Sequence, residues 1–197
     1  MPEQGDSPWK LPSLEAYFDS GLIPRAGDPA ALVLLGYAIF RPGELDWRRS
    51  LTGGCLTCRP GDAVRGLWGL KHSRLGPRER AGFAESKAAG GLQFYDLVAA
   101  RALGVNLRNN DFDGKIEIFG DGQQVIRFLS GELGALTLHA GDIEFARELR
   151  AEVLEGFGPK IRANWRFVRR EFNLADAAIK ALHQINMRQY ESMASRP

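Results

Sequence analysis

Apolar residues recur every three or four positions in three segments of the chain, and each segment predicts a helix. The first spans 92–103 and the second 143–155. The third spans 174–193, where Asn173 supplies a side chain suited to cap the first turn. Glycine or proline follows the first two segments, which fixes where those helices end.

A fourth helix is predicted over 159–172, because Ile161, Trp165, Val168 and Phe172 follow the spacing i, i+4, i+7 and i+11. Pro159 suits a first-turn position. On this helix the arginines of the segment would form a ridge beside the apolar face.

The first half of the chain predicts helices as well. A short helix is expected over 13–18. The segment 30–40 is apolar all round and long for a strand, which favours a buried helix. Two further helices are expected over 63–75 and 78–89, between breaks rich in glycine and proline.

The apolar period changes to about two in the middle of the chain. The runs 115–119 and 124–129 flank Gly120-Asp-Gly-Gln123, a pattern typical of a β-hairpin, and 135–139 adds a candidate third strand. The predicted fold class is therefore α+β, a mostly helical single domain with a central antiparallel β-hairpin or small sheet.

The domain organisation follows from the same pattern. Residues 1–12, with three prolines, predict a flexible N-terminal tail, and 13–197 a single domain. That domain can be subdivided into a helical part, 13–104, and a part with the hairpin and the C-terminal helices, 105–197.

Composition narrows the class of protein. The chain has 197 residues, 44% hydrophobic and 25% charged, as in an ordinary globular protein. This excludes a disordered chain, a collagen-like fibre and a disulfide mini-protein. No apolar run reaches about 18 residues, and the polar first residues contain no secretory signal. Only two cysteines occur, so a cytoplasmic protein with reduced thiols is expected.

Charge is strongly segregated although the net charge is only +2. Residues 47–80 carry eight basic and two acidic side chains, and 156–170 carry five basic and none acidic. Residues 111–155 carry ten acidic and four basic side chains. A local cluster of arginines attracts polyanions even when the whole chain is nearly neutral.

The leading prediction is a non-enzymatic protein that contacts the phosphate backbone of DNA or RNA, within a larger nucleoprotein assembly. Arginine suits bidentate phosphate contacts. The candidate binding residues are Lys160, Arg162, Arg166, Arg169 and Arg170, with Lys71, Arg74, Arg78 and Arg80. The competing interpretation is that the first group pairs with the acidic helix that follows Asp142.

Two other classes of function stay open. A protein-binding adaptor or inhibitor would use adjacent basic and acidic faces to steer a protein partner. A winged helix over 78–129 would read DNA, but its recognition helix offers only Gln93 and Arg101, and Asp121 at the hairpin tip would repel phosphate.

An enzyme is the third class, and the sequence argues against it more than for it. Cys55 and Cys58 have the spacing of half a zinc site or of a redox dithiol, but no second such pair exists. Asp111, Asp113 and Glu117 lack the spacing of a calcium loop. Phosphate-binding loops, nucleophile elbows and zinc-protease motifs are absent from the sequence. No catalytic residue, metal or cofactor is predicted.

Overall fold

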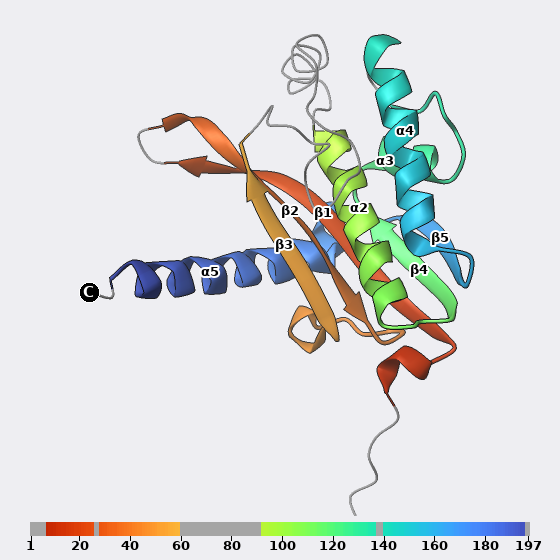
Figure 1. Ribbon diagram of the computed structural model, residues 1–197, viewed down its shortest axis with the longest axis horizontal. Helices are drawn as coiled ribbons and strands as arrows, with labels where there is room; N and C mark the ends of the chain where they lie inside the picture. Colours follow the sequence, from red (N-terminus) through yellow and green to blue (C-terminus); the bar gives the residue numbers. More distant parts are fainter. Residues whose placement is uncertain (1–6, 26–27, 60–91, 137–139, 196–197) are drawn as a thin grey trace, which may run out of the picture.

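The computed structural model describes residues 7–25, 28–59, 92–136 and 140–195, which form a mixed five-stranded sheet with helices on both faces (Figure 1). The strand order is β3-β2-β1-β4-β5. The strands are β1 (Ser13–Arg25), β2 (Asp28–Phe40), β3 (Thr52–Cys58), β4 (Gly114–Gly120) and β5 (Ile161–Phe167). The first three pair antiparallel, whereas β4 runs parallel to β1 and β5 runs parallel to β4.

Four α-helices and three short 3-10 turns complete the described part of the chain. The helices are α2 (Leu92–Asn109), α3 (Gln123–Leu129), α4 (Ala140–Phe157) and α5 (Leu174–Ala194). The turns are η1 (Pro8–Lys10), η2 (Trp47–Arg49) and η4 (Arg170–Phe172). No helix among these residues is long and apolar enough to cross a membrane.

The helices form two layers around the sheet. Helix α2 packs on β1 and β2 with α4 behind it, and α5 crosses β1, β2 and β3 on the opposite face (Figure 1). The alternation of side chains along β1 gives each layer its own core, because successive residues point to opposite faces. Phe18 belongs to the larger cluster, beneath α2, and Tyr17 to the smaller one, beneath α5.

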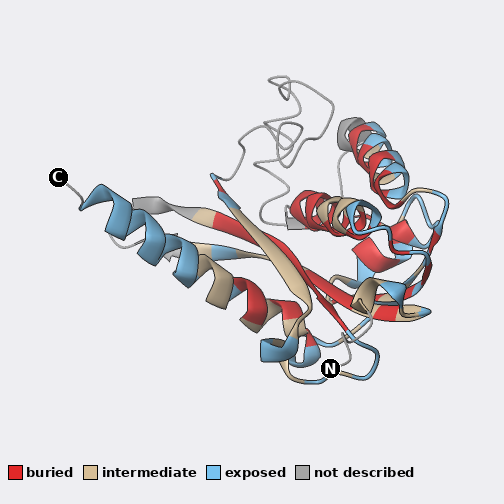
Figure 2. Cartoon of the chain, turned by 60° about the horizontal axis from the view of Figure 1, so that its bottom comes forward, coloured by how far each residue is buried: buried red, intermediate tan, exposed pale blue. Residues whose placement is uncertain are grey.

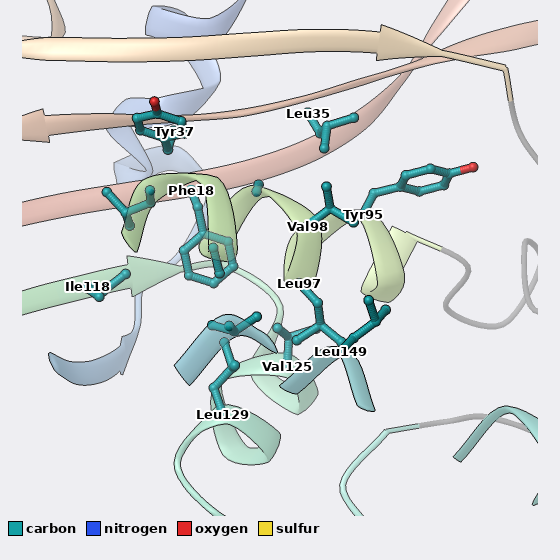
Figure 3. Close-up of a cluster of buried hydrophobic side chains, with 14 of the residues drawn as sticks. Phe18, Leu35, Tyr37, Tyr95, Leu97, Val98, Ile118, Val125, Leu129 and Leu149 are labelled. Carbon is teal, nitrogen blue, oxygen red and sulfur yellow. The ribbon is translucent and has the colours of Figure 1, made fainter. Parts of the chain in front are cut away.

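The larger cluster holds most of the buried apolar side chains (Figure 3). Phe18, Leu35 and Ile118 project from the sheet, Leu97 and Val98 from α2, and Leu149 from α4. Full burial of such side chains contributes about 1.5–3 kcal/mol each. The far half of α5 is different, since its residues are exposed beyond Gln184 (Figure 2).

The prediction of helices over 13–18 and 30–40 is wrong, because both segments are central strands of the sheet. Residues 32–40 are buried, apart from Leu32, because α2 covers one face of β2 and α5 covers the other. A strand buried on both faces reads as a continuous apolar run, without the alternation of a half-exposed strand. The run was predicted as a helix because it is unusually long for a strand.

The predicted hairpin is also wrong in its second half. β4 coincides with the first predicted strand, but 123–129 forms helix α3, which buries Val125, Ile126, Phe128 and Leu129. β4 has β1 on one side and β5 on the other, so no edge is left for a hairpin partner. Residues 135–136 of the third candidate strand are not in a strand, and 137–139 lie outside the described residues.

The predicted helix over 159–172 is replaced by β5 and the turn η4. Along β5 the side chains alternate, with Ile161, Ala163 and Trp165 inward and Arg162 and Arg166 exposed. The same residues satisfy both a helical and a strand spacing at several positions, and the prediction chose the wrong period.

Three of the other helix predictions are confirmed, and two fall on residues that the structure does not describe. Helices α2, α4 and α5 confirm the predicted helices, and the Asn173 side chain accepts a hydrogen bond from the Ala175 amide at 3.0 Å, as a capping residue does. The predicted helices 63–75 and 78–89 lie outside the described residues.

The α+β class is confirmed. The sheet has five strands and is mixed, so the mostly helical fold with an antiparallel hairpin is corrected.

Gly36 in β2 provides a test of how closely α5 packs on the sheet. A Cβ atom there would collide with the Gly54 carbonyl oxygen of β3 and lie 2.9 Å from a side-chain carbon of Ile179. We expect Gly36→Ala to lower the free energy of unfolding by about 1–3 kcal/mol, because overpacking of this kind forces the backbone to shift. Urea unfolding measures the loss. Gly21→Ala, where nothing lies within 4 Å, is the matched control and should change stability far less.

Candidate active site

The candidate site lies where β4 leaves β1. The last paired residues are Tyr17 and Phe119, and β4 ends at Gly120, whereas β1 continues to Arg25. The two strands are parallel, and crevices beyond the carboxyl ends of parallel strands are the usual ligand sites of such sheets. Three aspartates from distant parts of the sequence, Asp19, Asp121 and Asp176, line one cavity of about 440 Å³ at this point.

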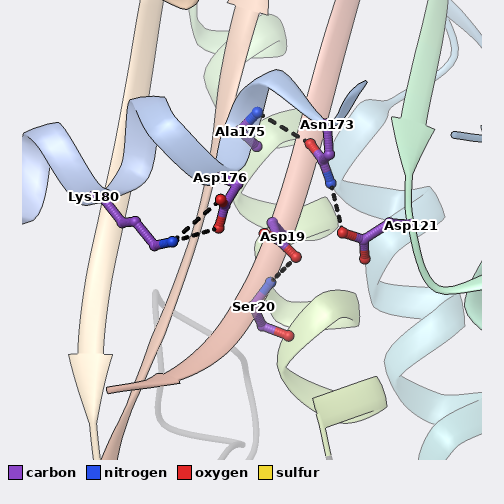
Figure 4. Close-up of polar contacts among 7 residues, drawn as sticks. All are labelled: Asp19, Ser20, Asp121, Asn173, Ala175, Asp176 and Lys180. Atoms are coloured by element: carbon purple, nitrogen blue, oxygen red, sulfur yellow. Dashed lines mark hydrogen bonds and ion pairs between the residues drawn. The ribbon is translucent and has the colours of Figure 1, made fainter. Parts of the chain in front are cut away.

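Asp19 lies on β1, two residues beyond the last β1–β4 pair (Figure 4). Its carboxylate accepts a hydrogen bond from the Ser20 amide at 2.9 Å. Burial, followed by repulsion from Asp121 and Asp176, raises the pKa of Asp19 to about 7. The nearby Arg170 guanidinium acts in the opposite sense. The raised pKa therefore reflects first the burial of Asp19 and second the crowding of negative charge around it.

Asp121 follows directly after β4, and Asn173 connects it to the neighbouring elements (Figure 4). The buried Asn173 amide donates to the Asp121 carboxylate at 3.3 Å and to the Phe18 carbonyl oxygen of β1 at 3.1 Å. Asn173 also caps α5. One side chain therefore fixes β1, the end of β4 and the start of α5 relative to one another. Burial raises the pKa of Asp121, whereas Asn173 and Arg170 oppose the shift.

Asp176 stands in the first turn of α5 and pairs with Lys180 one turn later. The Lys180 ammonium lies 3.1 Å from a carboxylate oxygen of Asp176 (Figure 4). Lys180 and Arg170 both line the cavity beside the three aspartates. The cavity thus combines a group of carboxylates with two cationic side chains at its margin.

A fourth aspartate reaches the site from the opposite side of the sheet. Asp96 on α2 is 8% exposed, and its carboxylate accepts a hydrogen bond from the Ser20 hydroxyl at 2.6 Å. Burial raises its pKa well above the ordinary value, and Asp19 and Asp121 add to the effect. Ser20 lines the cavity and Asp96 does not, so the Ser20 hydroxyl is the hydrogen-bonded link between Asp96 and the site.

The donor set fits a hard divalent cation, since carboxylate oxygens are the ligands that Mg²⁺ prefers. Among the described residues, no three acidic, histidine or cysteine side chains are arranged closely enough to enclose an ion. Mg²⁺ commonly retains several waters and is held by one or two carboxylates together with substrate phosphates. Asp19, Asp121 and Asp176 fit such an open site, and their mutual repulsion would be relieved by a cation.

The arginines predicted to form one ridge are dispersed. Arg162 and Arg166 are exposed on β5, and Arg166 pairs with Glu117 of β4 at 3.5 Å. For Arg166 this differs from the competing interpretation, in which these cations pair with the acidic helix after Asp142. Of the predicted residues that the structure describes, only Arg170 lines the carboxylate cavity. The binding roles of Lys160, Arg162, Arg166 and Arg169 stay predictions, and Lys71, Arg74, Arg78 and Arg80 lie outside the described residues.

The two cysteines cannot jointly bind a metal or form a dithiol centre in this fold. Neither is in a disulfide, and both lie on β3, three positions apart, so they point to opposite faces of the sheet. Cys58 is buried in the larger core, and the Cys55 thiol receives a hydrogen bond from Asn186 of α5 at 3.4 Å. Asp111 and Asp113 are exposed loop residues before β4. Neither alternative proposed from the sequence forms a metal site here.

Known proteins with a similar arrangement were found only among solved structures. One is ribonuclease H1 from the halophilic archaeon Halobacterium salinarum, at 19% identity over 84% of this chain and 93% of that chain, with a TM-score of 0.47. Another is the N-terminal RNase H domain of a Mycobacterium tuberculosis protein, at 12% identity over 88% and 99%, with a TM-score of 0.46. A third is LC11-RNase H1 in complex with an RNA/DNA hybrid, at 15% identity over 86% and 99%, with a TM-score of 0.47.

The chain is similar to these ribonucleases H in outline. No family model matches the sequence, and neither does any curated protein.

The predicted non-enzymatic function is corrected at this point. The similar structures are ribonuclease H enzymes. The arginine helix on which the prediction rested is a strand, and the cavity where β1 and β4 diverge is lined by three carboxylates. Asp121 was predicted to be the tip of a hairpin, and no role was predicted for Asp19, Asp96 or Asp176.

Proposed function

We propose that the protein is a divalent-metal-dependent nuclease that hydrolyses phosphodiester bonds at the cavity between β1, β4 and α5. One observation carries the proposal: Asp19, Asp121 and Asp176, from three separate elements, line one cavity and are close enough for the latter two to raise the pKa of the first. The outline that the chain shares with ribonucleases H agrees with it, and the RNA/DNA hybrid bound by one of them makes nucleic acid the natural substrate to test.

Each residue has a definite task in this proposal. One or two of the carboxylates of Asp19, Asp121 and Asp176 would hold the cation together with the substrate phosphate, and the bound cation would supply Lewis acidity at the phosphate and an activated water. Asn173 positions Asp121 through its 3.3 Å hydrogen bond. Arg170 at the cavity margin attracts the phosphate group that the carboxylates alone would repel.

Ser20 and Asp96 hold Asp19 in position from the α2 side of the sheet. The buried Asp96 holds the Ser20 hydroxyl, and the Ser20 amide in turn donates to the Asp19 carboxylate. This chain of contacts fixes Asp19 at the open edge of β1. Positioning of this kind matters because misplacement of a reacting group by about 1 Å can reduce the rate about 100-fold.

A cleavage assay with and without metal tests the proposal. Labelled single-stranded RNA, single-stranded DNA, both duplexes and an RNA/DNA hybrid are incubated with the protein and Mg²⁺ or Mn²⁺. We expect at least one substrate to be cut, the cutting to stop when EDTA is added, and excess Mg²⁺ to restore it. Folded protein that cuts none of these substrates with either metal would overturn the proposal, as would cleavage that persists in EDTA.

A further inference from the structure

A second cavity adjoins the carboxylate site on the α5 side of the sheet. Its volume is about 370 Å³, and it lies between Trp47 of η2 and the beginning of α5. Arg170 and Asp176 line both cavities, so the two spaces are neighbours with a shared wall. Leu174 and Ala177 add apolar surface to the second cavity.

Trp47 is held in place by the loop that carries it. Asp46 caps the turn by accepting a hydrogen bond from the Arg48 amide at 3.0 Å. The Glu44 carboxylate accepts from the Asp46 amide, also at 3.0 Å. The Arg48 guanidinium lies 5.0 Å from the centre of the indole ring. The turn also packs against α5, and therefore the indole forms a preformed wall of the cavity.

The chemistry of this cavity suits an unpaired nucleobase. An indole ring offers a stacking surface to any base, and arginine can contact the phosphate that joins the base to its neighbour. Trp47 is only half-buried, although it touches the smaller core. Arg48 and Arg49 follow Trp47 in the same turn, and both are exposed, so they provide positive charge for the backbone.

We propose that the Trp47 cavity binds the base of a nucleotide adjacent to the phosphate at the carboxylate site, with Arg170 between the two. The inference rests on the proposed nuclease function and deepens it, because a base that enters this cavity cannot be paired. The substrate class is therefore a single strand or an unpaired end of DNA or RNA. A continuous duplex would leave the cavity empty.

Abasic oligonucleotides test this proposal directly. Binding is measured by fluorescence anisotropy in the Asp19→Asn variant, in which cleavage is expected to be strongly reduced, with short labelled single strands that each lack one base. We expect one abasic position to weaken binding by about 5- to 100-fold, the range that stacking of one base provides. Adding Trp47→Ala should weaken binding of the intact strand by a similar factor and remove the penalty at that position.

Matched variants separate stacking from folding. Trp47→Phe retains an aromatic wall and should retain most of the penalty. Leu45→Ala, in the same loop at an 83% exposed residue, should behave as the unaltered protein. Loss of the melting transition in Trp47→Ala would shift the comparison to Trp47→Phe and to Ala177→Trp, which fills the cavity and should also abolish the penalty.

The experiments distinguish a failure of the base cavity from a failure of the nuclease function. An unchanged abasic penalty after Trp47→Ala, or equal affinity for single strands and blunt duplexes, would overturn the base cavity while leaving metal-dependent cleavage in place. Position-specific binding without any cleavage by the unaltered protein would overturn the nuclease function and leave the cavity as a binding site.

Discussion

Replacing Asp19 by asparagine is expected to reduce metal-dependent cleavage by more than about 100-fold while the protein stays folded. Loss of an outer partner of a metal ligand already costs about 10- to 100-fold, so loss of a ligand carboxylate should cost more. Asparagine keeps the size of the side chain and can still accept a hydrogen bond from the Ser20 amide, which donates at 2.9 Å. The effect would therefore come from the missing charge.

The measurement is the initial rate of cleavage at saturating Mg²⁺, with circular dichroism to check folding. Asp121→Asn is expected to show the same loss, because Asp121 lines the same cavity. Asp113→Asn is the matched control, since Asp113 is an exposed carboxylate in the loop before β4. Full activity in Asp19→Asn would remove the carboxylate site from the mechanism.

The second large effect concerns stability as a function of pH. The pKa of Asp19 is raised to about 7 in the folded protein, against 3.8 for an ordinary aspartate. Between these two values the folded state retains a proton that the unfolded chain has released. Stability should therefore fall as the pH rises from about 4 to about 7 and stay reduced above that range. A shift of this size corresponds to at most about 4 kcal/mol.

Asp19→Asn removes this penalty. In urea unfolding we expect the variant to be more stable than the unaltered protein at about pH 8, and the difference to shrink at about pH 5, where Asp19 is protonated. Mg²⁺ should stabilise the unaltered protein at the higher pH, and it should stabilise the variant less, because binding to the folded state alone adds to stability. Identical pH profiles for the two proteins would contradict the raised pKa.

The helices could largely be predicted from the sequence, but the sheet could not. Helices α2, α4 and α5 have one buried face and periodic apolar residues, which is the pattern that sequence analysis detects best. β2 is buried on both faces by α2 and α5, and therefore has no alternation to reveal it. The position of β5 beside β4 depends on contacts between distant parts of the chain, which no local pattern records.

The site was missed for a related reason. Asp19 and Asp96 each interrupt an apolar stretch that the fold buries, and a lone carboxylate in such a place is costly unless it has a use. That signal was present in the sequence. The convergence of Asp19, Asp121 and Asp176 was not, because their separation along the chain is bridged only by the pairing of β1 with β4 and the packing of α5 on β1.

The three roles of Asn173 have a consequence for how the site opens. Its amide joins the Phe18 carbonyl oxygen, the Asp121 carboxylate and the first turn of α5. Any local opening that frees this side chain releases the beginning of α5 and moves Asp176 away from the other carboxylates. Amide hydrogens in the first turns of α5 should then exchange with solvent in the same cooperative step that disassembles the site. Amide hydrogen exchange at the beginning of α5 would therefore report whether the site is intact, without a substrate.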